Sequence, residues 1–119
     1  MTLNQKVNQT LKGKIIIDGE TLPIDFLFYK GDKKSYMTFY SPYETPDFFA
    51  GDETLDSTLS VTITLFSDKN YINAFERIKE LMTEAGFIWT GDSPDMFDDE
   101  TGIYQKASDF ATERSLLNG

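Results

Sequence analysis

The chain has 119 residues, which is enough for one domain with one modest core. It contains no cysteine and no histidine, so disulfides, thiolate or imidazole metal sites and histidine-assisted nucleophiles are excluded. A net charge of −9 disfavours nucleic-acid binding through the general surface, because phosphate contacts need clustered lysine and arginine. No segment approaches the roughly 18 apolar residues of a membrane span, so we expect a cytosolic protein that crosses no membrane.

The first apolar pattern predicts a short helix. Leu3, Val7 and Leu11 recur at a spacing of four residues, which places them on one face of a helix over residues 1–12. Thr2 precedes the first of them and is suited to cap the helix. We therefore expect an N-terminal helix with one apolar stripe.

The segment 13–35 contains the short-range signal of a β-hairpin. Asp18 and Gly19 separate two apolar runs, and both residues tolerate the positive φ of a two-residue turn. A strand is predicted over residues 24–29, and another, with the sequence YMTFY, over residues 36–40. This part of the chain is therefore expected to contribute strands to a sheet.

The clearest strand is the segment STLSVTITLF, residues 57–66. Its apolar residues alternate strictly with hydroxyl-bearing ones. Such a strand belongs to a sheet with one buried face and one face that meets water or a partner. The buried face is predicted to hold Leu59, Val61, Ile63 and Leu65, and the other face Thr58, Ser60, Thr62 and Thr64.

A second helix is predicted over residues 68–85. Ser67 or Asp68 is suited to cap it, and Gly86 is expected to end it through a positive φ. Beyond it, the sequence predicts a strand or extended turn in FIWTG, a last strand in GIYQKASDFATER, and a frayed tail over residues 113–119. The apolar stripe of this helix, the expected cover of the buried sheet face, comprises Tyr71, Phe75, Ile78, Leu81, Met82 and Ala85.

This order of elements predicts an α+β fold. Strands between and after two helices favour a two-layer sandwich, in which a mostly antiparallel sheet carries both helices packed on one face. We expect a single domain over residues 1–119, with the sheet and the central helix inside residues 36–112.

The charge is unevenly distributed along the chain. Residues 1–43 carry six lysines and four acids, a net charge of +2, whereas residues 44–119 carry sixteen acids and five bases, a net charge of −11. The plainest interpretation is that excess charge keeps a small protein soluble. The excess is nevertheless concentrated, because ten of the twenty acids fall in two short segments.

These two segments share one composition. Residues 44–56 and 92–100 each hold five acids and no base, with the apolar pairs Phe48-Phe49 and Met96-Phe97 at their centres. Acidic loops with aromatics suit a partner, because aromatics anchor interfaces and a charged rim steers the encounter. The aromatics could instead pack beneath their own loops. The candidate partner-binding residues are Asp47, Phe48, Phe49, Asp52, Glu53, Asp56, Asp95, Met96, Phe97, Asp98, Asp99 and Glu100.

The acidic segments do not fit a catalytic or metal-binding motif. DSPDMFDDETGI lacks the glycine and the oxygen spacing of a helix–loop–helix calcium site, which leaves only weak cation binding by clustered carboxylates. A catalytic carboxylate pair needs one buried member and a pocket, whereas these acids are expected to be solvated. The eight glycines are scattered, so no phosphate-binding loop occurs. We therefore expect no catalytic residue, cofactor or metal, and a protein that is not an enzyme.

Most of the chain, roughly residues 36–112, resembles the tail-completion proteins of long-tailed phages and prophages of Gram-positive hosts. These proteins are also called tail terminators or head–tail joining proteins. The shared pattern is an aromatic strand, an acidic connection, an alternating strand, a helix that ends in EAGF, and a final signature. Residues 13–35 carry no part of it. The signature is formed by Pro94, Asp95, Phe97, Glu100, Thr101, Tyr104, Lys106, Ala107 and Phe110.

The resemblance implies a structural role without catalytic residues. It implies a ring, expected to contain six subunits, that caps the finished tail tube and joins it to the head connector. The implied partners are the major tail-tube protein, the head-closure or connector protein and further copies of the chain, with no sequence-specific nucleic-acid binding. The implied location is the host cytoplasm during assembly and then the head-proximal end of the virion tail. We expect a monomer or weak oligomer in isolation.

An alternative function of another class remains open at this point. An acidic protein can act alone as an inhibitor, either by imitating the charge of DNA or as an immunity-type partner of a basic toxin. DNA mimics favour carboxylates spaced along a surface like phosphates, whereas half of the acids here are clustered in two segments. The clustering therefore disfavours DNA mimicry.

Overall fold

The computed structural model describes the backbone of residues 1–48 and 54–117, and their side chains except those of residues 48, 54 and 55. The helices of this part are α1 (Leu3–Leu11) and α2 (Ile72–Glu84), and a 3-10 turn, η1 (Arg114–Leu117), follows the last strand. The strands are β1 (Ile16–Ile17), β2 (Glu20–Thr21), β3 (Ile24–Phe26), β4 (Tyr36–Tyr40), β5 (Glu44–Phe48), β6 (Thr54–Ser67), β7 (Ile88–Asp92), β8 (Met96–Asp98) and β9 (Ile103–Glu113).

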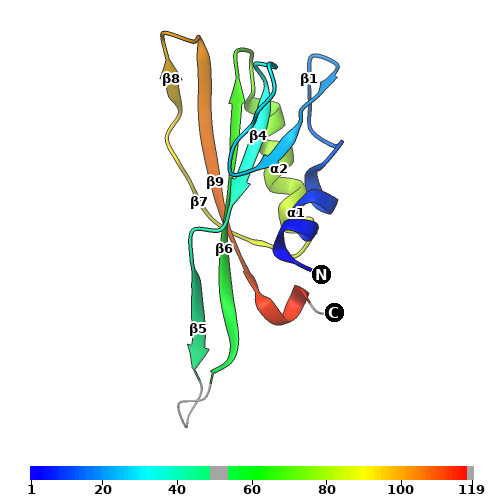
Figure 1. Cartoon of the computed structure of the whole chain (residues 1–119), viewed down its shortest axis with the longest axis vertical. Helices are drawn as coiled ribbons and strands as arrows, with labels where there is room; N and C mark the ends of the chain where they lie inside the picture. The colour runs from blue at the N-terminus through cyan, green and yellow to red at the C-terminus, as the bar shows by residue number, and fades with distance from the viewer. Residues whose placement is uncertain (49–53, 118–119) are drawn as a thin grey trace.

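The main sheet is built around two long strands, β6 and β9. Its order is β3-β4-β6-β9-β7, with β5 also paired to β6 and β8 also paired to β9. β4 and β5 pair with successive parts of β6, while β7 and β8 pair with successive parts of β9. These pairs are antiparallel, and β3 with β4 is parallel. The molecule is accordingly elongated, 53 by 25 by 24 Å (Figure 1).

Both helices lie on one side of the sheet (Figure 1), so the predicted α+β fold is confirmed. Alternate residues of β6 turn toward them, and Val61 and Ile63 are fully buried. The predicted stripe of α2 supplies the other side of the core, and of its members only Ala85 is partly exposed. Burying one such side chain contributes about 1.5–3 kcal/mol, so this interface dominates the stability. Within the described ranges, neither helix has the length and apolar character needed to cross a membrane.

The N-terminal helix begins as predicted. The Thr2 hydroxyl accepts a hydrogen bond from the Gln5 amide at 3.1 Å, and the Gln5 side chain accepts one from the Thr2 amide at 2.8 Å. This capping box satisfies two amides that the first turn would otherwise leave unpaired. The hairpin β1–β2 is also confirmed, with φ of 50° at Asp18 and 81° at Gly19.

The second helix is shorter at its start than predicted. It begins at Ile72, and neither Ser67 nor Asp68 caps it. Ser67 is fully buried and its hydroxyl bonds the Ser35 hydroxyl at 2.7 Å, so its side chain links the end of β6 to the residue before β4 instead. Its end is as predicted, because Gly86 has a φ of 98° and its amide donates to Thr83, while the Phe87 amide donates to Met82.

Two other boundaries differ from the sequence-based prediction. The strand predicted over residues 24–29 ends at Phe26, because Leu27 has a φ of 70° and the chain turns there. Within the frayed tail predicted over residues 113–119, Glu113 still belongs to β9 and residues 114–117 form η1, in which Leu117 is buried. Residues 118–119 lie outside the described residues. Ordering of η1 is favoured because the Ser115 amide donates to Asp56 at 3.1 Å.

Candidate interaction surfaces

The two acidic segments are strands of β-hairpins, although they were predicted to be loops. β5 pairs with β6 at one end of the molecule, and β8 pairs with β9 at the other (Figure 1). Sequence patterns missed these strands because β8 is short and acidic and β5 contains Pro46, and such residues are disfavoured in strands except at edges. We call residues 95–105 the upper hairpin, and residues 44–48 with 54–59 the lower hairpin.

The structure therefore separates the candidate residues into two groups. Those from Asp95 to Glu100 lie together in the upper hairpin, and Asp47 and Asp56 lie in the lower one. Phe49, Asp52 and Glu53 lie outside the described residues, as does the side chain of Phe48. The two groups do not form one site, because they occupy opposite ends of the long axis (Figure 1).

The turn of the upper hairpin is held by Asp98. Its carbonyl accepts the Gly102 amide at 2.8 Å, and its carboxylate accepts the Glu100 amide at 3.0 Å. Gly102 adopts a φ of 73°, which a side chain would disfavour. The exposed carboxylates of Asp99 and Glu100 thus project from an ordered turn.

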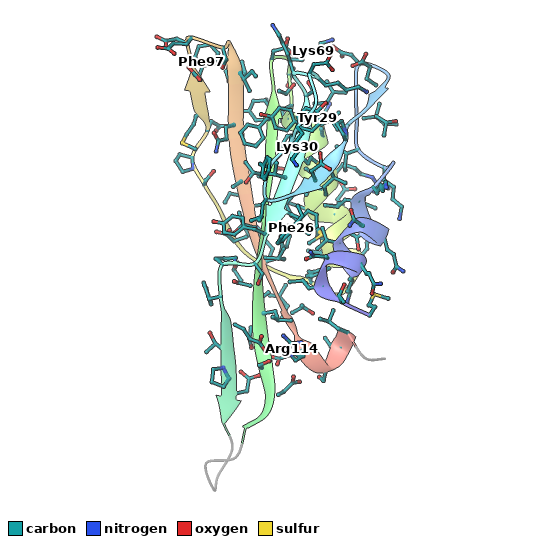
Figure 2. The ribbon with its side chains drawn as sticks, viewed as in Figure 1. Phe26, Tyr29, Lys30, Lys69, Phe97 and Arg114 are labelled. Atoms are coloured by element: carbon teal, nitrogen blue, oxygen red, sulfur yellow. The ribbon has the colours of Figure 1, made fainter. Side chains whose placement is uncertain are left out.

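Apolar side chains flank this acidic turn. Phe97 is 54 % exposed and Met96 is 44 % exposed, and they point to opposite faces of the hairpin. The Phe97 ring packs against Tyr104 at 4.7 Å between centroids, so one side of it is supported and the other faces solvent. Figure 2 shows Phe97 near the end of the molecule. The Phe97 ring is thus neither buried beneath its own hairpin nor free of contacts with it.

The base of the upper hairpin is anchored to α2 through Asp95. The Tyr71 hydroxyl donates a hydrogen bond to the Asp95 carboxylate, and Lys106 Nζ lies 3.3 Å from its other oxygen. The Tyr71 bond, with help from Lys106, lowers the pKa of Asp95. Burial, followed by the bond to Asp95, raises the pKa of Tyr71 to about 12. Asp95 therefore serves first to position the hairpin.

The lower hairpin engages its carboxylates within the chain. Glu44 accepts two hydrogen bonds from Arg114, at 2.8 and 2.7 Å, and one from the Ser57 hydroxyl. These bonds, that of Arg114 above all, lower the pKa of Glu44 to about 2. Asp56 accepts bonds from the amide and the hydroxyl of Ser115, and the hydroxyl bond is the main reason that its pKa is lowered. Figure 2 shows Arg114 beside this hairpin.

One acidic pair in the lower hairpin is unfavourable. Carboxylate oxygens of Asp47 and Glu113 each lie 3.1 Å from the Thr58 hydroxyl, which has one proton to donate. The carboxyl of Asp47, and then burial, raise the pKa of Glu113. Two carboxylates this close repel each other when both are ionised, so the pair is unfavourable in its doubly charged form.

The sheet face opposite the helices carries the hydroxyl row predicted from β6. Thr62 and Thr64 are nearly buried there, and the rings of Tyr29, Tyr36 and Phe66 form a continuous stack with centroids 4.4 and 4.7 Å apart. A hollow of about 290 Å³ joins this stack to the upper hairpin. The sequence reasoning missed its members outside the acidic segment, although the alternation of β6 would have placed Phe66 on that face. The hollow is lined by Tyr36, Phe66, Met96, Phe97, Asp98, Thr101, Ile103 and Gln105.

The hollow and the hairpins offer contact surfaces for other molecules. In the part of the chain with described placement, no group of three or more acidic side chains is arranged to hold a metal ion. Searches with protein-family models and against curated proteins find no match to this chain.

Proposed function

We propose that this protein is a phage or prophage tail-completion subunit, which caps the tail tube and joins it to the head connector as part of a ring. The observation that carries the proposal is the position of the two acidic hairpins at opposite ends of a 53 Å molecule. A joining protein must contact two different partners, one on each side. Two recognition surfaces facing away from each other meet that requirement within a single subunit.

The chemistry of the upper hairpin supports a protein partner. Asp99 and Glu100 lie exposed on an ordered turn, next to the half-exposed ring of Phe97. An apolar anchor with a charged rim is the usual anatomy of an interface, in which the charge speeds and orients the encounter. Because the turn is ordered by Asp98 before binding, little conformational entropy is lost on contact.

The position of the acids also supports a ring. Subunits with a net charge of −9 repel one another unless their acidic groups lie away from the contacts between them or meet basic groups there. The described acids of the two hairpins lie toward opposite ends of the long axis, so subunits placed side by side would carry them near the two rims of a ring. At one rim, the exposed acids of the upper turn would meet a basic surface of the tube or the connector.

The test is capture of this protein by tail-tube subunits from its own gene cluster, with imaging of tube ends. We expect the wild type to form a discrete ring at one end of the tube. The double variant Asp99→Lys/Glu100→Lys should cap tubes at least about tenfold less well, as expected when charge pairs at an interface are reversed. A matched control is Glu20→Lys/Glu84→Lys, which makes the same charge change at two exposed positions outside both hairpins.

The outcomes separate the proposal from its alternative. Capping by the wild type and the control, but not by the hairpin variant, supports the joining role. Absence of any capping by the wild type, together with tight binding to a basic nuclease or toxin encoded nearby, would establish an acidic inhibitor instead. Equal capping by all three proteins would show that the upper hairpin is not part of the interface.

A further inference from the structure

We infer that the two edges of the main sheet bind each other between copies of this chain, so that β3 and the crossover after it contact β7 and β8 of the next copy. The inference deepens the proposed function, because it names the lateral contact of the ring. We call residues 26–34 the basic edge, and residues 88–100 the acidic edge. The occupant of each edge is thus a second copy of the same protein.

The strand order places these two segments on opposite edges. β3 ends the sheet on one side, next to β4. On the other side β9 pairs with β6 along one flank, so β7 and β8 occupy its second flank and end the sheet there. A surface on one edge cannot reach the other edge of its own chain, and the contact must be intermolecular.

The basic and acidic segments adjoin strands at the same end of the sheet. The pairing of residues forms one row across the sheet from Tyr36 through Phe66 and Gln105 to Met96. Lys33 and Lys34 precede the start of β4 at one end of this row, and β8 leads from Met96, at the other end of the row, into the turn that holds Asp98 to Glu100. Two copies placed side by side without an axial shift would therefore bring opposite charges together.

Within the part of the chain that the structure describes, these charges have no ion-pair partner. Among the described residues, ion pairs involve neither Lys30, Lys33 and Lys34 nor the acids of the upper turn. Lys30 instead lies 5.2 Å from the Phe28 ring centroid. Asp25 and Asp32 reduce the net charge near the basic edge to +1, whereas the upper turn carries −3. The complementarity is therefore local, and it centres on the adjacent pair Lys33 and Lys34.

Apolar residues add a reason for association that does not depend on charge. Fourteen large hydrophobic side chains are exposed in the described part of the chain, and seven of them lie on the two edges. Singly exposed hydrophobics are normal, but a cluster beside complementary charge indicates an interface. The seven are Phe26, Leu27 and Phe28 on the basic edge, and Ile88, Trp89, Met96 and Phe97 on the acidic edge.

Contact between two different surfaces of one protein is head-to-tail. Such a contact repeats from copy to copy and either closes into a ring or continues as a filament, depending on the rotation at each step. It cannot produce a closed two-fold dimer, which needs one surface on both copies. The inference consequently predicts association that continues beyond a dimer as the protein concentration rises.

The test exchanges charge between the edges. One variant is Lys33→Glu/Lys34→Glu, the other is Asp99→Lys/Glu100→Lys, and Glu20→Lys/Glu84→Lys is the control. Sedimentation velocity is measured over a concentration series at about 0.01 M ionic strength, where screening extends over roughly 30 Å. We expect concentration-dependent association of the wild type and the control, and association at least about tenfold weaker in each edge variant alone.

An equimolar mixture of the two edge variants decides the matter. In alternating copies, the unchanged edges meet as in the wild type and the reversed edges meet with their charges exchanged, so association should be restored. The inference is overturned if the wild type stays monomeric throughout the series, if the edge variants associate like the control, or if the mixture associates no better than its components.

The same mixture distinguishes this inference from the proposed function. Restored association together with restored capping of tail tubes would mean that the upper hairpin acts through the lateral contact. Restored association without capping would support the lateral contact. It would also show that the upper hairpin contacts the tail tube directly. Association of the wild type without any capping would leave the edge contact standing and refute the joining role.

Discussion

The upper and lower hairpins share a composition and differ in how their acids are used. In the lower hairpin, Glu44 and Asp56 bind Arg114 and Ser115, which follow the last strand. In the upper hairpin only Asp95 is bound across elements, while the acids of the turn are exposed. The same residue types thus fasten the chain at one end and present charge at the other. What decides the role of the lower acids is η1, which lies far along the chain from residues 44–56.

The largest expected effect tests whether both hairpins depend on one support. Phe110 is fully buried on β9, the strand that holds parts of both. We expect Phe110→Ala to lower the free energy of unfolding by about 3–5 kcal/mol, because it leaves a cavity in the core. Denaturant unfolding measures the loss, and hydrogen exchange should report weaker protection of β5 and β8 together. Loss of protection at one hairpin alone would mean that they are stabilised independently.

A smaller effect is expected when the anchor of the upper hairpin is removed. Tyr71→Phe keeps the buried ring and deletes the hydroxyl that donates to Asp95. The loss should be about 1 kcal/mol, the usual net value of one such hydrogen bond. Amide exchange should accelerate in β8 and remain unchanged in β5. Equal acceleration at both ends would show that Asp95 does not act locally.

The lower hairpin should show an acid-sensitive stability. The pKa of Glu44 falls from its ordinary value of 4.5 to about 2 in the folded chain. A group with a lowered pKa stabilises the fold above its ordinary pKa, and this contribution is lost as the pH falls toward about 2. Glu44→Gln should therefore reduce the melting temperature at pH 7, and the difference from the wild type should shrink between pH 4.5 and 2. A difference independent of pH would contradict the role of the Arg114 pair.

The contribution of Glu113 to stability should depend on pH in the opposite direction. Its pKa is raised, so the folded chain holds its proton more tightly than the unfolded chain does. That contribution is present below the ordinary pKa and is lost as the pH rises through the raised value. We expect Glu113→Gln to raise the melting temperature at pH 7, with a gain that disappears at low pH. A lower melting temperature at pH 7 would mean that the charged form of Glu113 is favoured in the fold.

The smallest effect on stability is expected at the upper turn. Asp99 and Glu100 are exposed, and neither forms an ion pair with another described residue. The double change to lysine should alter the free energy of unfolding by less than about 0.5 kcal/mol, as is usual for surface sites. Urea titration provides the measurement. A loss of several times this size would show that the turn contributes to the fold as the lower hairpin does.

Sequence patterns were sufficient where periodicity is strong. The alternation around Val61 and Ile63 and the stripe of α2 predicted the sheet face, the helix and the layer between them, since burial imposes both periods. They were insufficient where long-range pairing overrides local preference. β8 is acidic and only three residues long, and it is a strand because β9 lies beside it. Leu27 ends β3 through a positive φ that no local residue preference indicates.

The candidate site was predicted only in part, because local patterns identify segments but not the long-range contacts between them. Composition identified both acidic segments, and the structure places the upper residues on one turn. It could not indicate that Glu44 and Asp56 are bound by Arg114 and Ser115, because those contacts join residues 70 and 59 positions apart. Nor could it show that β4, which follows Lys33 and Lys34, starts at the same end of the sheet as the acidic turn, because that depends on the register of four strands.

The pairing of β6 with β9 has a consequence for the order of folding. Thr62 and Asp109, bonded side chain to side chain across this pair, are 47 residues apart, and α2 lies between the two strands in the sequence. Closing so long a loop costs entropy before any contact repays it, so chains with such pairings fold in milliseconds to seconds. Until β9 pairs with β6, one edge of β6 has no partner strand. The upper hairpin cannot form without β9, and the lower hairpin lacks the strand that pairs with β6 at residues 58 and 59. We expect α2 and the hairpin of β4 and β6 to form first, and the acidic surfaces to be completed only in the last step.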